Sequence, residues 1–245
     1  MMLSRVLRSK MSQPPEGGAL EARSASRTHV GHVRQINEDR ILDRPERSLW
    51  AVADGMGGHH SGDVAAQLVI DALDAVDRPD AEAIMRALQG ANAALYGRAQ
   101  KGAPRSGTTI VVASARDRVA DIFWAGDSRA YLVRAATIKL LTRDHSVVQR
   151  LVDAGALSAE EALRHPKANV ITRALGVEAE IQIEHRQVAL RPGDILLLCS
   201  DGLSRTLGTE VPRSTCLEDL ASLLIDQAMH RDGSDNASIV VVAIA

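Results

Sequence analysis

The sequence has very few aromatic residues and only two cysteines. Phe, Trp and Tyr together make up 2% of its 245 residues, so it offers no platform of rings on which nucleic-acid bases could stack. Cys199 and Cys216 form neither a disulfide framework nor a zinc-ligand spacing. We therefore expect no nucleic-acid partner, and this cysteine usage is typical of the reducing cytoplasm.

The net charge is small, and the sequence has no long apolar run. The 29 basic and 31 acidic residues leave a formal charge of -2, which gives no bulk electrostatic reason to bind nucleic acid or an anionic membrane. No apolar run approaches the roughly 20 residues that span a bilayer. Residues 1–10 are basic but lack the apolar core of a signal peptide. We expect a cytoplasmic protein without a membrane segment.

The composition that is present belongs to an ordinary globular protein, with 45% hydrophobic and 24% charged residues. Residues 1–25 are rich in Ser, Pro, Gly and charge, which predicts a mobile N-terminal tail. No internal repeat or linker divides the remainder. We predict one domain over residues 26–245.

Acidic residues stand beside short apolar runs that predict buried β-strands. Asp54 follows the run 49–53, Asp127 follows 122–126, and Asp201 follows 195–200. Asp235 directly precedes the strand predicted at 237–245, and Glu38 and Asp39 form a further acidic pair. Any one Asp is an ordinary turn residue, but gathered carboxylates repel one another unless cations neutralise them. The pattern indicates an oxygen-lined site for hard divalent cations.

Arg34 lies close to these acids in the sequence. An arginine beside carboxylates is usually a salt-bridge partner. Its planar guanidinium is also well suited to binding a phosphate through paired hydrogen bonds. From the residues alone, both interpretations stay open.

The order of predicted elements favours two stacked antiparallel sheets with helices outside. Helical spacing appears at 61–73 and after residue 80, and β-rich runs at 108–115, 119–125, 130–134 and 137–141 are typical of an antiparallel meander. Residues 142–176 interrupt the strands with two short helical pieces, near 147–152 and 159–163. This segment is either a substrate flap or a plain surface connection. Strands at 181–188 and 194–199 and a helix at 216–230 follow.

Several motifs occur in a fixed order along the chain: RQINED (34–39), VADGMGGH (52–59), SGTT (106–109), AGDSR (125–129), NVITRALG (169–176), SDG (200–202) and DN (235–236). Together they closely resemble the metal-dependent protein phosphatases, the PPM or protein phosphatase 2C family, in its short bacterial form. The resemblance covers about residues 26–245 and is far more specific than any single motif.

The resemblance implies an α+β fold, a four-layer αββα sandwich of two antiparallel β-sheets flanked by helices. It implies a serine/threonine protein phosphatase in which water bound to Mn²⁺ or Mg²⁺ attacks phosphoserine or phosphothreonine directly. Asp54 would bridge two ions, with the Gly55 carbonyl on one and Asp201 with Asp235 on the other. Glu38 and Asp39 would hold metal-bound waters, a third and weaker ion would use Asp127 with Asp201, and Arg34 would hold the substrate phosphate.

One position departs from the pattern. Some relatives carry a histidine after the metal-site glycine that is proposed to protonate the leaving group, whereas this chain has Met56. His59 or a metal-bound water are the alternative proton donors.

The expected partners are a phosphoprotein substrate and an opposing bacterial Ser/Thr kinase, in some relatives one of a type VI secretion system, and the chain is expected to be a monomer. Two rival functions are a catalytically silent binding module and a phosphatase of small metabolites.

Overall fold

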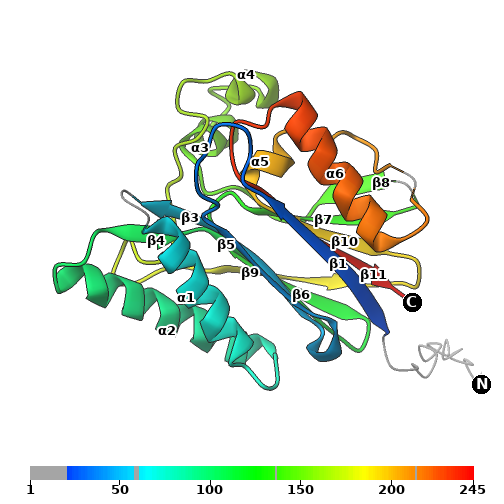
Figure 1. Ribbon diagram of the computed structural model, residues 1–245, viewed down its shortest axis with the longest axis horizontal. Helices are drawn as coiled ribbons and strands as arrows, with labels where there is room; N and C mark the ends of the chain where they lie inside the picture. Colours follow the sequence, from blue (N-terminus) through cyan, green and yellow to red (C-terminus); the bar gives the residue numbers. More distant parts are fainter. Residues whose placement is uncertain (1–20, 58–60, 136, 213) are drawn as a thin grey trace, which may run out of the picture.

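The structure, a computed structural model, describes residues 21–245 except 58–60, 136 and 213. Two antiparallel sheets lie face to face, with helices on the outer face of each (Figure 1). The first sheet has the order β1-β11-β10-β7-β8, formed by Ala22–His29, Ala237–Ile244, Ile195–Cys199, Arg129–Arg134 and Thr137–Leu140. The second has the order β2-β3-β5-β6-β9, formed by Asp39–Arg44, Leu49–Gly57, Ile110–Arg116, Val119–Ala125 and Glu184–Ala189. The short strand β4, Ser106–Thr108, pairs with the end of β3.

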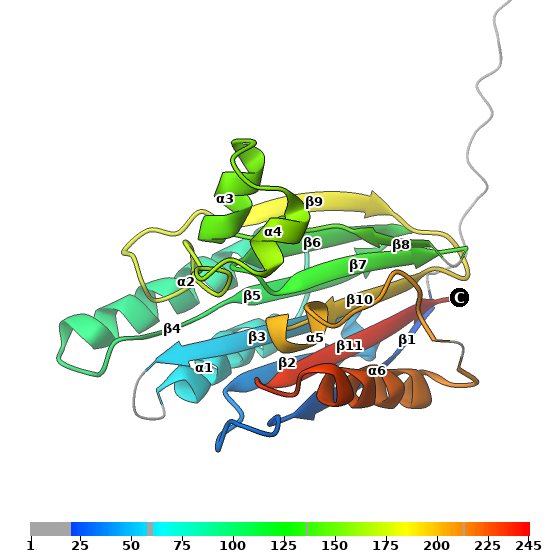
Figure 2. The same ribbon diagram turned by 90° about the horizontal axis from the view of Figure 1, so that it is seen from above.

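The helices complete four layers (Figure 2). Helices α1 (Gly62–Asp74) and α2 (Ala81–Gln100) cover the second sheet, and α6 (Leu217–Arg231) covers the first. The remaining short helices lie in connections: η1 (Pro45–Arg47), α3 (Val147–Asp153), α4 (Ala159–Leu163) and α5 (Asp201–Ser204). The predicted four-layer αββα sandwich is therefore confirmed, and both short helices expected within 142–176 are present.

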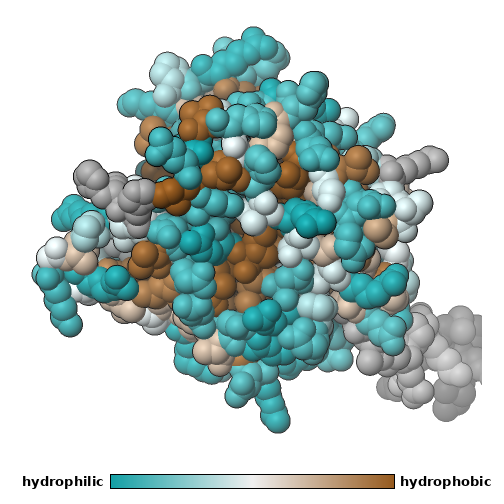
Figure 3. Space-filling view, viewed as in Figure 1, coloured by the Kyte–Doolittle hydropathy of each residue, from teal (hydrophilic) through white to brown (hydrophobic). Residues whose placement is uncertain are grey.

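Three hydrophobic clusters hold these layers together. Between the sheets, Trp50 packs among aliphatic side chains such as Val111, Leu196 and Val240, all fully buried. Separate clusters join α1 and α2 to one sheet and α6 to the other. Figure 3 shows hydrophobic side chains near the centre of one face, with mainly polar regions on either side. The sandwich is thus built almost wholly from aliphatic packing, as the scarcity of aromatic residues requires.

Three sequence expectations need correction. Residues 22–25, assigned to the tail, belong to β1, which pairs with β11 in the register Ala22↔Ile244. The predicted meander is also wrong, because the chain leaves one sheet after β6 and enters the other at β7, although β5–β6 and β7–β8 each pair. Finally, Asp54 does not end its strand, since β3 continues to Gly57 by exchanging β5 for β4 as its partner.

Within the part of the chain that the structure describes, every helix is too short or too polar to cross a lipid bilayer.

The inter-sheet core generates a stability prediction. Leu196→Ala removes a fully buried side chain between the sheets and should lower the free energy of unfolding by about 2–5 kcal/mol. Leu140→Ala is the matched control, since Leu140 is 41% exposed, and should cost less than about 1 kcal/mol. Urea denaturation measures both, and equal losses would contradict this assignment of the core.

Candidate metal centre

One cavity of about 250 Å³ collects the predicted acids from distant parts of the sequence. Asp54 comes from β3, Asp127 from the crossing between β6 and β7, and Asp201 from the start of α5. Asp235 lies just before β11. The cavity is also lined by Arg34, Glu38, Gly55, Met56, Gly57, Thr109, Asn169, Ile171, Arg205 and Asn236.

Backbone contacts fix Asp54 so that its carboxyl group faces this cavity. The Asp54 carbonyl accepts hydrogen bonds from the Thr109 N–H and the Thr108 hydroxyl, both at 2.9 Å. The next residue must be glycine, because a Cβ on Gly55 would lie 2.2 Å from the carbonyl oxygen of Gly62. The Asp-Gly pair of the motif therefore serves the close approach of α1 to the end of β3.

A second close approach brings Asp201 to Asp235. A Cβ on Gly202 would lie 2.2 Å from the Asn236 carbonyl oxygen, so glycine lets the start of α5 pack against the segment before β11. The Asn236 side chain then ties the loop of Glu38 to this segment: its Oδ1 accepts a hydrogen bond from the Glu38 N–H at 2.8 Å. Its amide group donates to the Val30 and Ile36 carbonyls at 2.8 and 3.0 Å. Asn236 is thus the structural anchor of the site.

The two residues of the acidic pair occupy different positions. Glu38 lines the cavity, and its Oε1 accepts a hydrogen bond from the Gly62 N–H at 3.1 Å. Asp39 is only 3% exposed, lies opposite Asp54 in the β2–β3 pairing, and is absent from the cavity lining. The Ser200 hydroxyl donates to Asp39 Oδ2 at 2.8 Å. The structure therefore places Asp39 next to Asp54 on the neighbouring strand, buried and outside the cavity lining.

Burial and mutual repulsion disturb the acids strongly. Burial, then the charges of Asp39, Asp201 and Asp127, raises the pKa of Asp54 well above its usual value. Burial raises the pKa of Asp39 and that of Asp127 to about 7. Within the described residues, Asp39 Oδ1 and Asp201 Oδ1 are buried without a hydrogen-bond partner. This cluster carries more negative charge than its protein surroundings balance.

Two arginines partly balance that charge. Arg34 donates to both oxygens of Asp235, at 2.9 Å from Nε and 3.0 Å from Nη2. Arg205 donates from Nη2 to Asp201 Oδ2. Five carboxyl groups line the cavity against these two guanidinium groups. Across the described ranges, no three acidic, histidine or cysteine residues already surround a common point, and two of the five carboxylates are engaged by arginine.

The donor set nevertheless fits divalent metal ions. Asp201 Oδ1 is buried without a partner among the described residues, and the pKa values of Asp54, Asp127 and Asp201 are raised. Hard cations such as Mg²⁺ and Mn²⁺ prefer oxygen ligands. Sequence reasoning missed Arg205. Its signal was the four-residue spacing from Asp201, which places two side chains on one face of a helical turn.

The residues considered for proton donation lie as follows. Met56 lines the cavity, where its thioether can pack but cannot donate a proton. His59 lies outside the described residues. No histidine occurs among the described residues that line this cavity.

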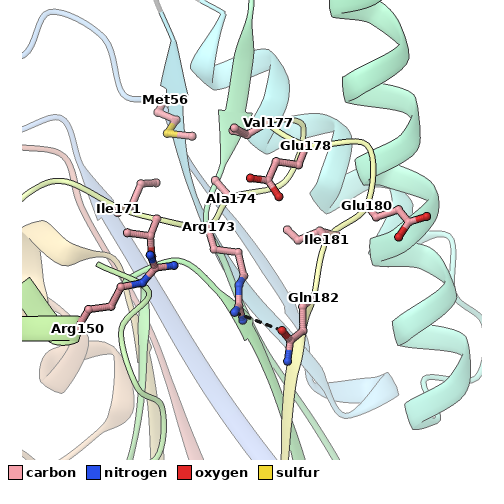
Figure 4. Close-up of a pocket in the computed structure, with 11 residues that line it drawn as sticks. Met56, Arg150, Ile171, Arg173, Ala174, Val177, Glu178, Glu180, Ile181 and Gln182 are labelled. Atoms are coloured by element: carbon pink, nitrogen blue, oxygen red, sulfur yellow. Dashed lines mark hydrogen bonds between the residues drawn. The ribbon is translucent and has the colours of Figure 1, made fainter. Parts of the chain in front are cut away.

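A larger cavity of about 560 Å³ adjoins the acidic one and shares Met56 and Ile171 with it. It is bordered by the end of the segment 142–176, by the residues that follow, and by Arg150 of α3 (Figure 4). Arg173 points toward Gln182, to which it donates at 3.5 Å. Segment 142–176 thus contributes walls to both cavities.

Comparisons with known proteins find similarity over most of this chain. A family model described as protein phosphatase 2C matches residues 26–232. The serine/threonine phosphatase stp of Listeria monocytogenes serotype 4b (strain F2365) is 34% identical over 235 residues, which cover 88% of this chain and 93% of that protein.

Two solved structures are similar over most of the chain. PppA, a key regulatory component of T6SS in Pseudomonas aeruginosa, has a TM-score of 0.84 and 35% identity, covering 93% of this chain and 100% of that one. The catalytic domain of the serine/threonine protein phosphatase PstP, in complex with two manganese ions, has a TM-score of 0.82 and 34% identity with the same coverages.

The raised pKa values predict how stability depends on pH when EDTA removes divalent ions. A carboxyl group whose pKa is higher in the folded protein stabilises the fold while it is protonated. That contribution is lost as the pH rises from about 4, the usual pKa, to about 7, the value of Asp39 and Asp127. The free energy of unfolding should therefore fall between pH 4 and pH 7, by about 1.4 kcal/mol per unit of pKa shift, and the melting temperature should fall with it. Calorimetry should show a smaller fall in melting temperature for Asp127→Asn over this pH range. An identical fall in the variant and in wild type would contradict the assignment.

Proposed function

The chain belongs to the protein phosphatase 2C family and is a serine/threonine protein phosphatase, and we propose that the acidic cavity is its active site. One observation carries this proposal: five carboxyl groups and the guanidinium of Arg34 line a single cavity although they come from five separate stretches of chain. A binding module that had lost catalysis would have no need to keep so unfavourable a cluster of buried charge.

Members of this family use metal ions, and the related PstP domain holds two manganese ions. We propose that Asp54, the Gly55 carbonyl, Asp201 and Asp235 hold two ions, either Mn²⁺ or Mg²⁺. When bound, such ions lower the pKa of water and neutralise phosphate oxygens during in-line displacement. Glu38 would contact their water shell from the cavity wall. Asp39 would contribute mainly its negative charge next to Asp54, because it does not line the cavity.

Arg34 is suited to orient the substrate phosphate. Its side chain is 55% exposed, and Asp235 holds it through Nε and Nη2. A guanidinium has five N–H donors, so donors remain that can reach a phosphate oxygen. The salt bridge and the phosphate role are therefore compatible, since the Asp235 contact fixes the direction of the guanidinium.

The leaving serine or threonine oxygen must receive a proton. Met56 cannot supply it, and the described lining contains no histidine, so we propose that water in the cavity does. The adjoining 560 Å³ cavity offers room for the protein chain on either side of the phosphorylated residue. This space favours a phosphoprotein over a small metabolite as substrate.

An opposing Ser/Thr kinase is the expected partner. The similarity to PppA supports a place beside type VI secretion, because PppA is a regulatory component of that system. Cytoplasmic location and a monomeric state stay predictions from the sequence.

Hydrolysis of a phosphothreonine peptide tests the proposed function. We expect turnover with Mn²⁺ or Mg²⁺, none with EDTA, and a loss of at least about 100-fold in kcat for Asp54→Asn, because that change removes the charge at the centre of the cluster. Phosphate release measures all four conditions. Folded wild-type protein that is inactive with both metals would favour the binding-module alternative.

The role of Arg34 has its own test. Arg34→Ala should raise KM about tenfold or more while Mn²⁺ affinity is retained, because a phosphate ligand is lost but every carboxylate remains. Arg86→Ala is the matched control, since Arg86 lies on α2 and pairs with Glu82 far from the cavity lining. Steady-state kinetics with the same peptide would refute this role if KM did not change.

A further inference from the structure

Arg205 is a second cation in the active-site cavity. It follows the last residue of α5, one helical turn after Asp201, and its backbone N–H donates to the Asp201 carbonyl at 3.0 Å. Its Nη2 donates to Asp201 Oδ2, and its side chain is 27% exposed. The helical turn therefore builds the guanidinium into the wall that carries Asp201.

The two arginines act on different sides of the acidic cluster. Arg34 donates from Nε and Nη2 to Asp235, whereas Arg205 donates from Nη2 to Asp201 Oδ2. Asp127 lines the same cavity as Asp201 and Arg205. Arg34 thus holds the Asp235 side of the cavity, and Arg205 holds the corner that carries Asp201 and Asp127.

The resemblance to the phosphatase family implies that a third, weaker ion would use this corner. Asp127 is 8% exposed and, like Asp201, lines the cavity near Arg205. Asp201 has two carboxylate oxygens: Oδ2 is engaged by Arg205, and Oδ1 is buried with no partner within the described chain. One oxygen therefore stays available for the two central ions. A third divalent ion would have to sit beside a fixed guanidinium, and like charges a few ångströms apart in a partly buried site repel strongly.

We propose that Arg205 is the fixed cation of the Asp127–Asp201 corner, so that this phosphatase works with two divalent ions and does not use a third. The inference rests on the proposed two-ion site and makes Arg205 a positioning residue for Asp201. It also gives this active site a positive charge at that corner that does not depend on metal concentration.

The test counts bound Mn²⁺ by equilibrium dialysis and calorimetric titration of the full chain. Wild type should bind two ions, and Arg205→Gln should bind three, with an affinity for the third at least about tenfold above any in wild type. Adding Asp127→Asn to Arg205→Gln should abolish the third ion. Arg231→Gln is the control, because Arg231 contacts the Thr206 carbonyl next to Arg205 but does not line the cavity; it should bind two ions.

A second variant keeps the test decisive if Arg205→Gln fails to fold. Asp127→Asn in the wild-type background should leave two bound ions, since Asp127 holds none of them. A drop from three ions to two would overturn the inference, as would an Arg205→Gln protein that binds only two.

Failure of the inference differs from failure of the proposed function. If wild type binds three ions and hydrolyses the peptide, only the role of Arg205 is wrong. If Arg205→Gln raises KM without changing the number of ions, Arg205 is a phosphate ligand and the inference is overturned. If wild type binds no Mn²⁺ and has no activity, both the proposed active site and the inference about Arg205 are wrong.

Discussion

The repulsion between buried carboxylates is the constraint on which this molecule depends. Asp39 and Asp54 lie opposite each other on neighbouring strands, an arrangement that destabilises a sheet when both residues are charged. Asp127 and Asp201 add to the same field, and burial raises the pKa of all four. Such a cluster persists only because the surrounding sandwich holds it, and its need for positive charge is what suits it to metal ions.

The sandwich supplies that support through close backbone packing. Gly55 and Gly202 allow α1 and the segment before β11 to approach the strand ends to distances that no side chain would permit. Asn236 then ties the loop between β1 and β2 to the segment before β11 through three hydrogen bonds of its amide group. These contacts place the carboxyl groups with little freedom to move apart. The aliphatic core between the sheets provides the rigidity behind them.

Arginine side chains give this active site its particular character. Arg34 is held by Asp235 and remains half exposed, so its guanidinium is positioned and accessible before a phosphate binds. Arg205 is held by Asp201 and acts on Asp127, which suits a permanent counter-charge. The cavity beside them has walls from segment 142–176 and the residues that follow. In the proposed function it receives the protein chain, whereas the acidic cavity receives the phosphate.

The sequence by itself determined the elements and the chemical type of the site. Periodicity located α1, α2 and α6, and the acids beside apolar runs indicated an oxygen-lined cation site, because both signals depend on local patterns. Tertiary structure decided the rest. Three features depend on contacts between different segments of the chain: the switch between sheets at Asp127, the pairing of Asp39 with Asp54 across two strands, and the pairing of Arg34 with Asp235. Such contacts leave no periodic trace in the sequence, since they follow from how whole sheets pack and not from the order of neighbouring residues.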